Sequence, residues 1–301
     1  MLAERRGLEV RWLEPRGGED AGSDTLAPEQ VAGLLDQRTR LVAMGLASNA
    51  TGRVHTSTYT RVREEGARLE RRPLLVLDLT HWVPHRRASL HDLGADALVC
   101  SAYKFCGPHL GLMALRGDRV RGLVPSKAGL RWEGGRRDLL DYGELPSTEN
   151  CQISRWELGT LNYEALAGLE ACVDYLASLG PEQGLEAGLA AVQKHEERLS
   201  ERFLARLSPL LEAGRLRMFG SREPRERTPT FALAVGEGRR EMELVEGLTE
   251  REVHCSHGNH YAPGLVEQGL GLEAVTRVSF MHYNTLEEVD RVADILEQIT
   301  E

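Results

Sequence analysis

Lys104 lies in a segment whose residue types suit covalent chemistry. The segment Ser101-Ala102-Tyr103-Lys104-Phe105-Cys106-Gly107-Pro108-His109 directly follows an apolar run. A lysine placed after a buried strand and before a Gly-Pro turn loses hydration, which makes its amine a usable nucleophile. The alternative is an exposed lysine in a turn, the commoner situation for this residue type. The segment therefore indicates a candidate nucleophile. The residues around Lys104 must decide between a nucleophile and an ordinary exposed lysine.

Asp78 and His81 favour a specific chemistry for that lysine. Asp78 ends an earlier apolar run, and His81 follows it, ahead of Pro84-His85. A buried carboxylate facing the pyridine nitrogen keeps the ring of pyridoxal 5'-phosphate (PLP) an electron sink, and an imidazole can hydrogen-bond the phenolic oxygen or move a proton. By themselves, His81 and His85 would be ordinary loop histidines. Together with Lys104, these residues predict a PLP site.

Residues 254–260 hold a second cluster of reactive residue types. Three histidines and a thiol, from His254, Cys255, His257 and His260, would satisfy a tetrahedral zinc ion and make the chain a zinc-dependent hydrolase. The spacing matches no familiar zinc motif, and no complementary cluster accompanies it. We therefore predict no metal ligands and keep the zinc enzyme as a distant alternative.

Alternating apolar runs and amphipathic stretches must position these residues. Strands are expected at Leu8–Leu13, Leu41–Leu46, Leu74–Leu77, Ala97–Cys100 and Leu110–Leu115, and helices at Pro28–Leu35 and Thr58–Leu69. This order is typical of an α/β fold, a mainly parallel sheet with helices on both faces. Ligands gather at the carboxyl ends of parallel strands, so Asn49, Asp78 and Ser101 should converge at one edge.

A domain boundary is expected at Gly180-Pro181, between helical patterns at Asn162–Leu179 and Leu185–Leu211. After them we predict strands at Pro229–Val235, Glu252–Cys255 and Ala274–Phe280, a helix at Glu241–Leu248, and a last helix opened by the capping box Thr285-Leu286-Glu287-Glu288. The expected organisation is a large α/β domain over residues 1–179 and a small α+β domain over residues 180–301.

Composition excludes several classes of protein. The net charge of −9 comes without a basic tract, which argues against a nucleic-acid partner. No run approaches the roughly 20 apolar residues of a membrane span, and no signal core follows the first residues, so we expect no membrane association and a cytoplasmic location. The five cysteines are odd in number and form no CxxC pair, which favours reduced thiols.

Four motifs in order make a family resemblance specific. They are Asp78-Leu79-Thr80-His81; Ser101-Ala102-Tyr103-Lys104 with Gly107-Pro108; Arg155-Trp156-Glu157-Leu158-Gly159-Thr160-Leu161-Asn162; and Arg277-Val278-Ser279 before Tyr283-Asn284-Thr285. Together they resemble the class V aminotransferase family of fold-type I PLP enzymes, most closely its cysteine-desulfurase-like branch. The similarity runs from about Gly7 to the end of the chain.

The resemblance implies roles around the cofactor. Lys104 would form the Schiff base with PLP and then move protons. Asp78 would pair with the pyridine nitrogen, and Asn49 would lie on the cofactor side. His81 would sit near the phenolic oxygen, where similar desulfurases often have glutamine.

It also implies contacts to the phosphate and the substrate. Ser101 would bind the phosphate, and Tyr103 would do so at a position where histidine is usual. Thr160 would reach the phosphate of a neighbouring subunit, which implies a homodimer. Arg277 would pair with the α-carboxylate of a small amino-acid substrate through its planar guanidinium.

Two departures qualify the resemblance. His260 occupies the place of the mobile-loop cysteine that attacks the substrate sulfur in similar desulfurases, so we group it with the substrate-binding residues; Cys255 is offset by about five residues and is expected to be packed. The family's Gly/Thr-rich phosphate turn and ring-stacking residue precede the region where this chain begins, so the N-terminal part of the family fold is expected to be missing.

These observations predict a PLP-dependent enzyme that acts on an amino acid through Lys104, by desulfuration or a related elimination or transamination. The alternative is a truncated or catalytically incompetent relative that serves as a partner subunit.

Overall fold

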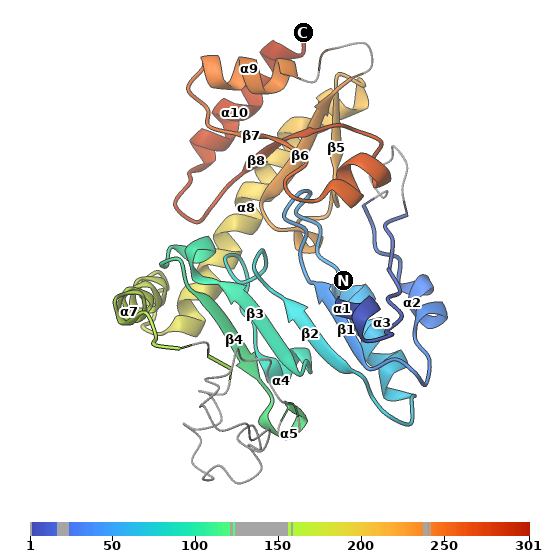
Figure 1. Cartoon of the computed structure of the whole chain (residues 1–301). Helices are drawn as coiled ribbons and strands as arrows, with labels where there is room; N and C mark the ends of the chain where they lie inside the picture. The colour runs from blue at the N-terminus through green and yellow to red at the C-terminus, as the bar shows by residue number, and fades with distance from the viewer. Residues whose placement is uncertain are drawn as a thin grey trace.

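The computed structural model describes residues 2–16, 24–120, 123, 156–157, 159–236, 240 and 242–301. Within these residues the strands form two four-stranded sheets, one before residue 116 and one after residue 215, with two long helices between them in the chain (Figure 1). None of the helices in these ranges is both long and apolar enough to cross a membrane.

The first sheet carries the motifs around Asp78 and Lys104. Strands β1 (Leu41–Gly45), β2 (Leu74–Asp78) and β3 (Ala97–Ser101) are parallel, and β4 (Gly111–Leu115) runs antiparallel to β3. Leu75 and Leu77 point to one face, where they pack in a core with residues of α2 (Pro28–Leu34) and α3 (Thr56–Ala67). Leu41 and Met113 belong to the opposite face and are exposed. The four strands lie close to their predicted positions, and β4 is the one strand that is not parallel.

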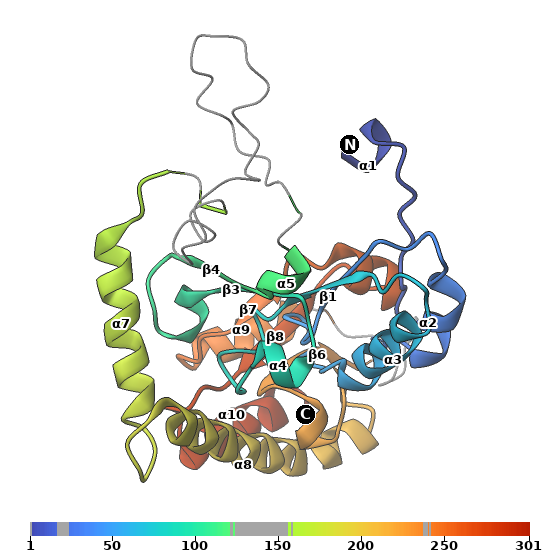
Figure 2. The ribbon, with the colours of Figure 1, turned by 90° about the horizontal axis from the view of Figure 1, so that it is seen from below.

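Helices α7 (Tyr163–Ala177) and α8 (Leu185–Glu212) follow, and they pack against each other (Figure 2). Asn162 begins α7, because its side chain accepts a hydrogen bond from the Ala165 amide. Gly188 lets the helices approach closely, since a Cβ there would lie 1.8 Å from the carbonyl oxygen of Leu176. The predicted boundary at residue 180 falls between these helices, and the division into domains stays a prediction.

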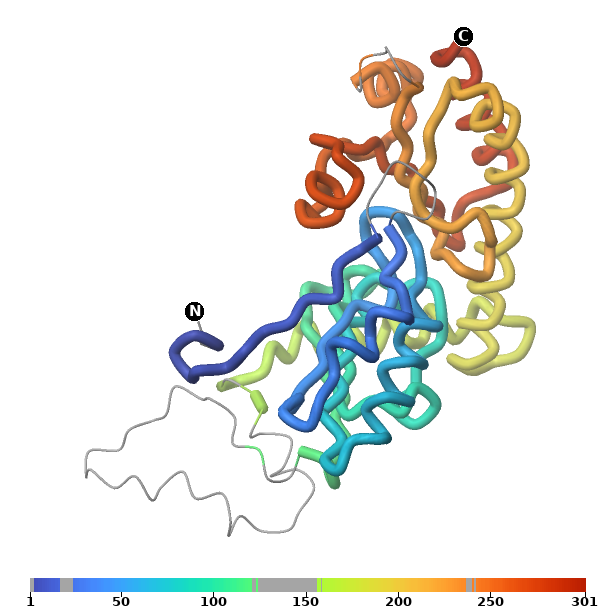
Figure 3. Tube along the Cα trace, turned by 90° about the vertical axis from the view of Figure 1, so that its right-hand side faces the viewer, coloured from blue at the N-terminus to red at the C-terminus, as the bar shows by residue number. Residues whose placement is uncertain are grey.

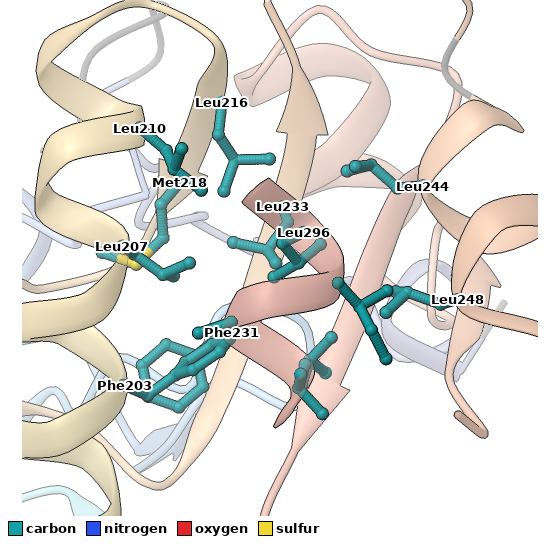
Figure 4. Close-up of a cluster of buried hydrophobic side chains, with 14 of the residues drawn as sticks. Phe203, Leu207, Leu210, Leu216, Met218, Phe231, Leu233, Leu244, Leu248 and Leu296 are labelled. Carbon is teal, nitrogen blue, oxygen red and sulfur yellow. The ribbon is translucent and has the colours of Figure 1, made fainter. Parts of the chain in front are cut away.

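The second sheet is antiparallel throughout, in the order β5 (Leu216–Phe219), β6 (Thr230–Val235), β8 (Val275–Ser279) and β7 (Ser256–Gly258). Its core forms where α8, α9 (Met242–Glu250) and α10 (Leu286–Ile299) cover one face, with the Phe203 and Phe231 rings in edge contact (Figure 4). The predicted capping box is confirmed: the Thr285 hydroxyl accepts from the Glu288 amide, and the Glu288 carboxylate accepts from the Thr285 amide.

Short elements complete the described chain: α1 (Leu2–Arg5), α4 (Leu90–Leu93), the 3-10 turns η1 (Ala102–Phe105) and η4 (Pro224–Glu226), α5 (Gly117–Val120) and the π-helix η5 (Gly264–Gly269).

Two predicted strands are wrong. Residues 8–13 form no strand: this N-terminal segment runs along the outside of the molecule (Figure 3), Leu8 and Trp12 are exposed, and neither described sheet includes it. The strand predicted at Glu252–Cys255 begins instead at Ser256, since Glu252 has a φ of +59°, which belongs to a turn and not to a strand.

Candidate active site

The carboxyl ends of β2 and β3 place Asp78 and Ser101 on one face of the first sheet. Asp78 pairs with Val99, and Ser101 lies two residues farther along β3, so both side chains leave the sheet on the same side. Asp78 accepts a 2.8 Å hydrogen bond from the Thr80 amide. We expected a buried carboxylate, but Asp78 is exposed, because the described residues leave this end of the sheet face uncovered.

Lys104 lies in η1, the single turn that follows β3 directly. Its side chain is exposed, and Nζ lies 5.2 Å from the centre of the Tyr103 ring. The Tyr103 ring in turn stacks on His109, with 5.0 Å between ring centres. Tyr103 is therefore held against His109, and its contact with a phosphate stays a prediction.

His81 contacts the second sheet and lies within the electrostatic influence of two other predicted residues. Its Nε2 atom lies 3.2 Å from the hydroxyl oxygens of both Thr228 and Thr230, which come from the second sheet. Burial lowers the pKa of His81 well below its usual value, and the positive charges of neighbours that include Arg277 and Lys104 lower it further. His81 is thus a neutral imidazole within electrostatic reach of the predicted nucleophile and the predicted carboxylate-binding residue.

Asn49, Arg277 and His260 form a connected group beside it. Arg277 donates a 2.8 Å hydrogen bond to the carbonyl oxygen of Asn49, and the Asn49 amide donates one of 2.7 Å to the carbonyl oxygen of His260. The His260 ring donates from Nε2 to the Val275 carbonyl at 3.1 Å, and its backbone has a φ of +53°. Burial lowers the pKa of Arg277. The loop after β1 is thereby joined to the second sheet.

Thr160 precedes α7, in a part of the chain that is remote in sequence from the loops and strands of this group. It is exposed in the segment that leads into α7, and Arg155 of the same motif lies outside the described residues. Its role at a partner's phosphate stays a prediction.

The zinc alternative finds no support in the described ranges, where no three His, Cys, Asp or Glu side chains gather to hold a metal ion. His254 is exposed, His257 contacts the Thr276 hydroxyl at 3.1 Å, and His260 bonds the Val275 carbonyl. Cys255 packs against the core of the second sheet, and burial raises the pKa of its thiol, which disfavours a reactive thiolate.

Sequence reasoning missed Thr228, Thr230 and Glu196. The two threonines stand just before the apolar run of β6, and nothing local shows that they reach His81, almost 150 residues away. Glu196 pairs with His85 in the interior. A signal for it was available, because Glu196 falls between Val192 and Leu199 on the apolar stripe of α8, where a carboxylate is unusual.

The sequence of this chain is similar to those of known PLP-family proteins, in agreement with the residues described above. The aminotransferase class-V family matches residues 1–292. This chain belongs to that family. It is 30% identical over 299 residues to an aminotransferase-like protein of Gibberella zeae and 29% identical over 303 residues to a cysteine desulfurase of Pectobacterium carotovorum. These alignments cover 96% and 99% of this chain and 66% of each relative, so the chain spans just under two-thirds of their length.

Solved structures confirm the predicted fold class. A cysteine desulfurase from Thermococcus onnurineus matches 99% of this chain and 68% of its own, with a TM-score of 0.77 and 24% identity. The cysteine desulfurase CsdA from Escherichia coli matches 99% of this chain and 67% of its own, with a TM-score of 0.72 and 20% identity. The chain has the fold of the fold-type I PLP enzymes.

Proposed function

We propose that this chain is a PLP-dependent enzyme that acts on an amino acid, with Lys104 as the residue that holds the cofactor covalently. The observation that supports this most directly is that Lys104 directly follows β3, beside the carboxyl end of β2, which carries Asp78. The Lys104 amine comes from η1, the His81 imidazole from the loop after β2, and the Arg277 guanidinium from β8. The positive charges of Lys104 and Arg277 both act on the His81 imidazole.

The chemistry of the residues fits PLP. Asp78 offers a carboxylate for the pyridine nitrogen, Lys104 an amine for the aldehyde, and Ser101 a hydroxyl for the phosphate. PLP, when bound, withdraws electrons from the α-carbon of the amino acid. Asn49 fixes the position of Arg277, whose guanidinium then pairs with the substrate carboxylate in a partly buried place where water competes little.

The protein's own groups would hold and move the protons. His81 is neutral, and its Nε2 atom is engaged by the two threonine hydroxyls, so Nδ1 is the nitrogen it offers to the phenolic oxygen. The Lys104 amine carries the proton to or from the substrate's α-carbon.

Desulfuration or a related β-elimination is the leading reaction class. Without a protein thiol as acceptor, the sulfur would leave as sulfide in the elimination, or pass to a thiol from solution, which becomes a persulfide, in the desulfuration. His260 has no sulfur, and its ring is held by the Val275 carbonyl. We expect weak or no persulfide on the protein after incubation with PLP and L-cysteine, measured by mass spectrometry. Strong persulfide formation that survives Cys255→Ser would contradict this, and loss of a strong signal in Cys255→Ser would assign the acceptor to Cys255.

We also propose a homodimer as the working unit, supported by the family resemblance at Thr160, and a cytoplasmic location. Light scattering tests the first, and a monomer at micromolar concentration would contradict it.

The deciding experiment uses the low lysine content of the chain, which holds only Lys104, Lys127 and Lys194. The protein is incubated with PLP, reduced with borohydride and mapped by peptide mass spectrometry. We expect the label on Lys104 and its loss in Lys104→Ala, while Lys194→Ala, a change on exposed α8 surface, leaves the label in place. Labelling elsewhere, or none in a folded protein, would remove the proposed function.

A further inference from the structure

Glu196 is a buried carboxyl group that packs against the loop of the candidate site. It lies on α8, with 2% of its surface exposed, and its Oε2 atom is 2.9 Å from Nδ1 of His85, which is 5% exposed. Its Oε1 atom lacks a well-formed hydrogen bond among the described residues, although the backbone amide of His282 lies near enough to the carboxyl group to lower its pKa. A carboxyl group in this situation is costly to bury, so it invites a functional explanation.

The His85 ring connects Glu196 to the site. It meets the His81 ring edge-on, with 5.4 Å between ring centres and 70° between ring planes. Both histidines belong to the same short loop after β2. Fixing the orientation of one ring therefore limits the orientation of the other.

The Glu196–His85 pair is neutral. Burial raises the pKa of Glu196 to about 8 and lowers that of His85 to about 3. The carboxyl group then keeps its proton and donates it in a hydrogen bond to Nδ1, which leaves the imidazole proton on Nε2 of His85.

Charged and titratable groups from every neighbouring element face this pair. Arg86 approaches from the site loop, His195 lies beside Glu196 on α8, and His282 approaches from the loop after β8; each lowers the pKa of Glu196, but burial outweighs them. Burial lowers the pKa of Arg86, and the negative charge of Glu197 offsets part of that effect. Burial thus keeps the Glu196–His85 pair neutral although positively charged and titratable groups lie around it.

We propose that Glu196 is a positioning residue for His81 that acts through His85, an inference that rests on the proposed function of His81 at the cofactor. The hydrogen bond from Glu196 locks the His85 ring, and the locked ring supports His81 while the Thr228 and Thr230 hydroxyls hold its Nε2 atom. The neutral pair also keeps an additional positive charge away from His81, which already lies near Lys104 and Arg277.

The test follows the imidazole nitrogens by NMR in protein labelled with ¹⁵N-histidine, without PLP. Glu196→Leu fills the buried volume without a donor, Glu196→Gln keeps a donor, and Glu201→Leu is the control on the exposed face of α8. In the wild type we expect His85 to show an unprotonated Nδ1 and no titration between pH 5 and 8. In Glu196→Leu, His85 should change its tautomer or titrate, and the His81 resonances should shift with it. Glu196→Gln should restore the wild-type spectrum.

A second readout concerns the cofactor. PLP affinity should fall by on the order of tenfold in Glu196→Leu and recover in Glu196→Gln, the size of effect seen when an outer hydrogen-bond partner of a bound group is lost. Unchanged His81 resonances in a folded Glu196→Leu protein, or equal shifts in Glu201→Leu, would overturn the proposal. Because the NMR experiment needs no cofactor, it separates failure of this inference from failure of PLP to label Lys104.

Discussion

The planar shape of the Arg277 guanidinium, and not only its charge, should determine how tightly the substrate carboxylate binds. One of its nitrogens is committed to the Asn49 carbonyl, which leaves the rest of the planar fork for a carboxylate. Arg277→Lys keeps a positive charge but loses one of two parallel hydrogen bonds, each worth about 1.5–3 kcal/mol when charged. We expect KM for L-cysteine or L-alanine to rise roughly tenfold or more in Arg277→Lys. Arg198→Lys, on the exposed face of α8, is the matched control, and an unchanged KM in Arg277→Lys would remove Arg277 from the substrate site.

The Glu196–His85 pair gives stability a defined pH profile. Folded, the pair binds one proton from about pH 3 to about pH 8; unfolded, with ordinary pKa values of 4.5 and 6.5, it binds one proton only between those values. Above pH 6.5 the unfolded chain has released the proton that the folded chain still holds, so the free energy of unfolding falls as pH rises toward 8. The pair's contribution should fall by about 1–2 kcal/mol between pH 6.5 and pH 8, since 1.36 kcal/mol per pH unit is the limiting slope and both titrations are half complete at these endpoints.

Urea unfolding at pH 6.5 and pH 8 measures this change. Glu196→Gln cannot release that proton, so its free energy of unfolding should stay nearly constant over the same range, while Glu201→Gln should follow the wild type. If the wild type and Glu196→Gln changed in parallel, the raised pKa of Glu196 would be wrong.

For single residues, the sequence predicted the candidate site residues but not the side chains that contact them. Lys104, His81 and Arg277 were named from motifs, and the structure shows that the charges of Lys104 and Arg277 lower the pKa of His81. The contacts that orient them come from Thr228, Thr230 and Glu196, which are distant in the chain and belong to no recognisable motif. Local spacing carries no information on which remote side chain meets a loop, because tertiary packing decides it.

Helix α10 shows an element that the sequence specifies almost completely. Its capping box satisfies two backbone donors at the first turn, and its apolar residues pack against the second sheet. Thr285→Ala should therefore lower the free energy of unfolding by about 1 kcal/mol. Thr249→Ala, on the exposed surface of α9, removes no cap and should change stability little. Chemical denaturation of both variants measures the difference, and equal stabilities would show that the cap is dispensable.

The elements that were predicted wrongly lack such local determinants. Residues 8–13 have the composition of a strand, yet strand formation needs an available sheet edge, which composition does not report. The strand expected at Glu252 moved to Ser256 because the backbone turns at Glu252, a non-glycine residue with positive φ that no sequence pattern announces. Helices and buried strands follow their hydrophobic period, whereas edges and turns depend on their neighbours.

Arg227 joins the two halves of the molecule. It is 2% exposed, and its guanidinium donates to the Thr51 carbonyl in the loop after β1 and to the Ser221 and Thr230 carbonyls around the second sheet. The same group lies 3.8 Å from the centre of the Phe231 ring. One buried side chain thus satisfies acceptors in the loop after β1 and around the second sheet, which makes it a candidate for the contact that lets the halves unfold together.

Removing this side chain should separate their unfolding. Arg227→Ala leaves the three carbonyl groups without this donor, at a cost of roughly 3 kcal/mol or more. Trp82 is buried in the core beside the first sheet, so a change in its fluorescence reports unfolding of that half, whereas far-ultraviolet circular dichroism reports the whole chain. In the wild type the two urea transitions should coincide, and in Arg227→Ala they should part. Arg225→Ala, an exposed change two residues away, should behave as the wild type. Coincident transitions in Arg227→Ala would mean that other contacts, such as Arg277 with Asn49, suffice to couple the halves.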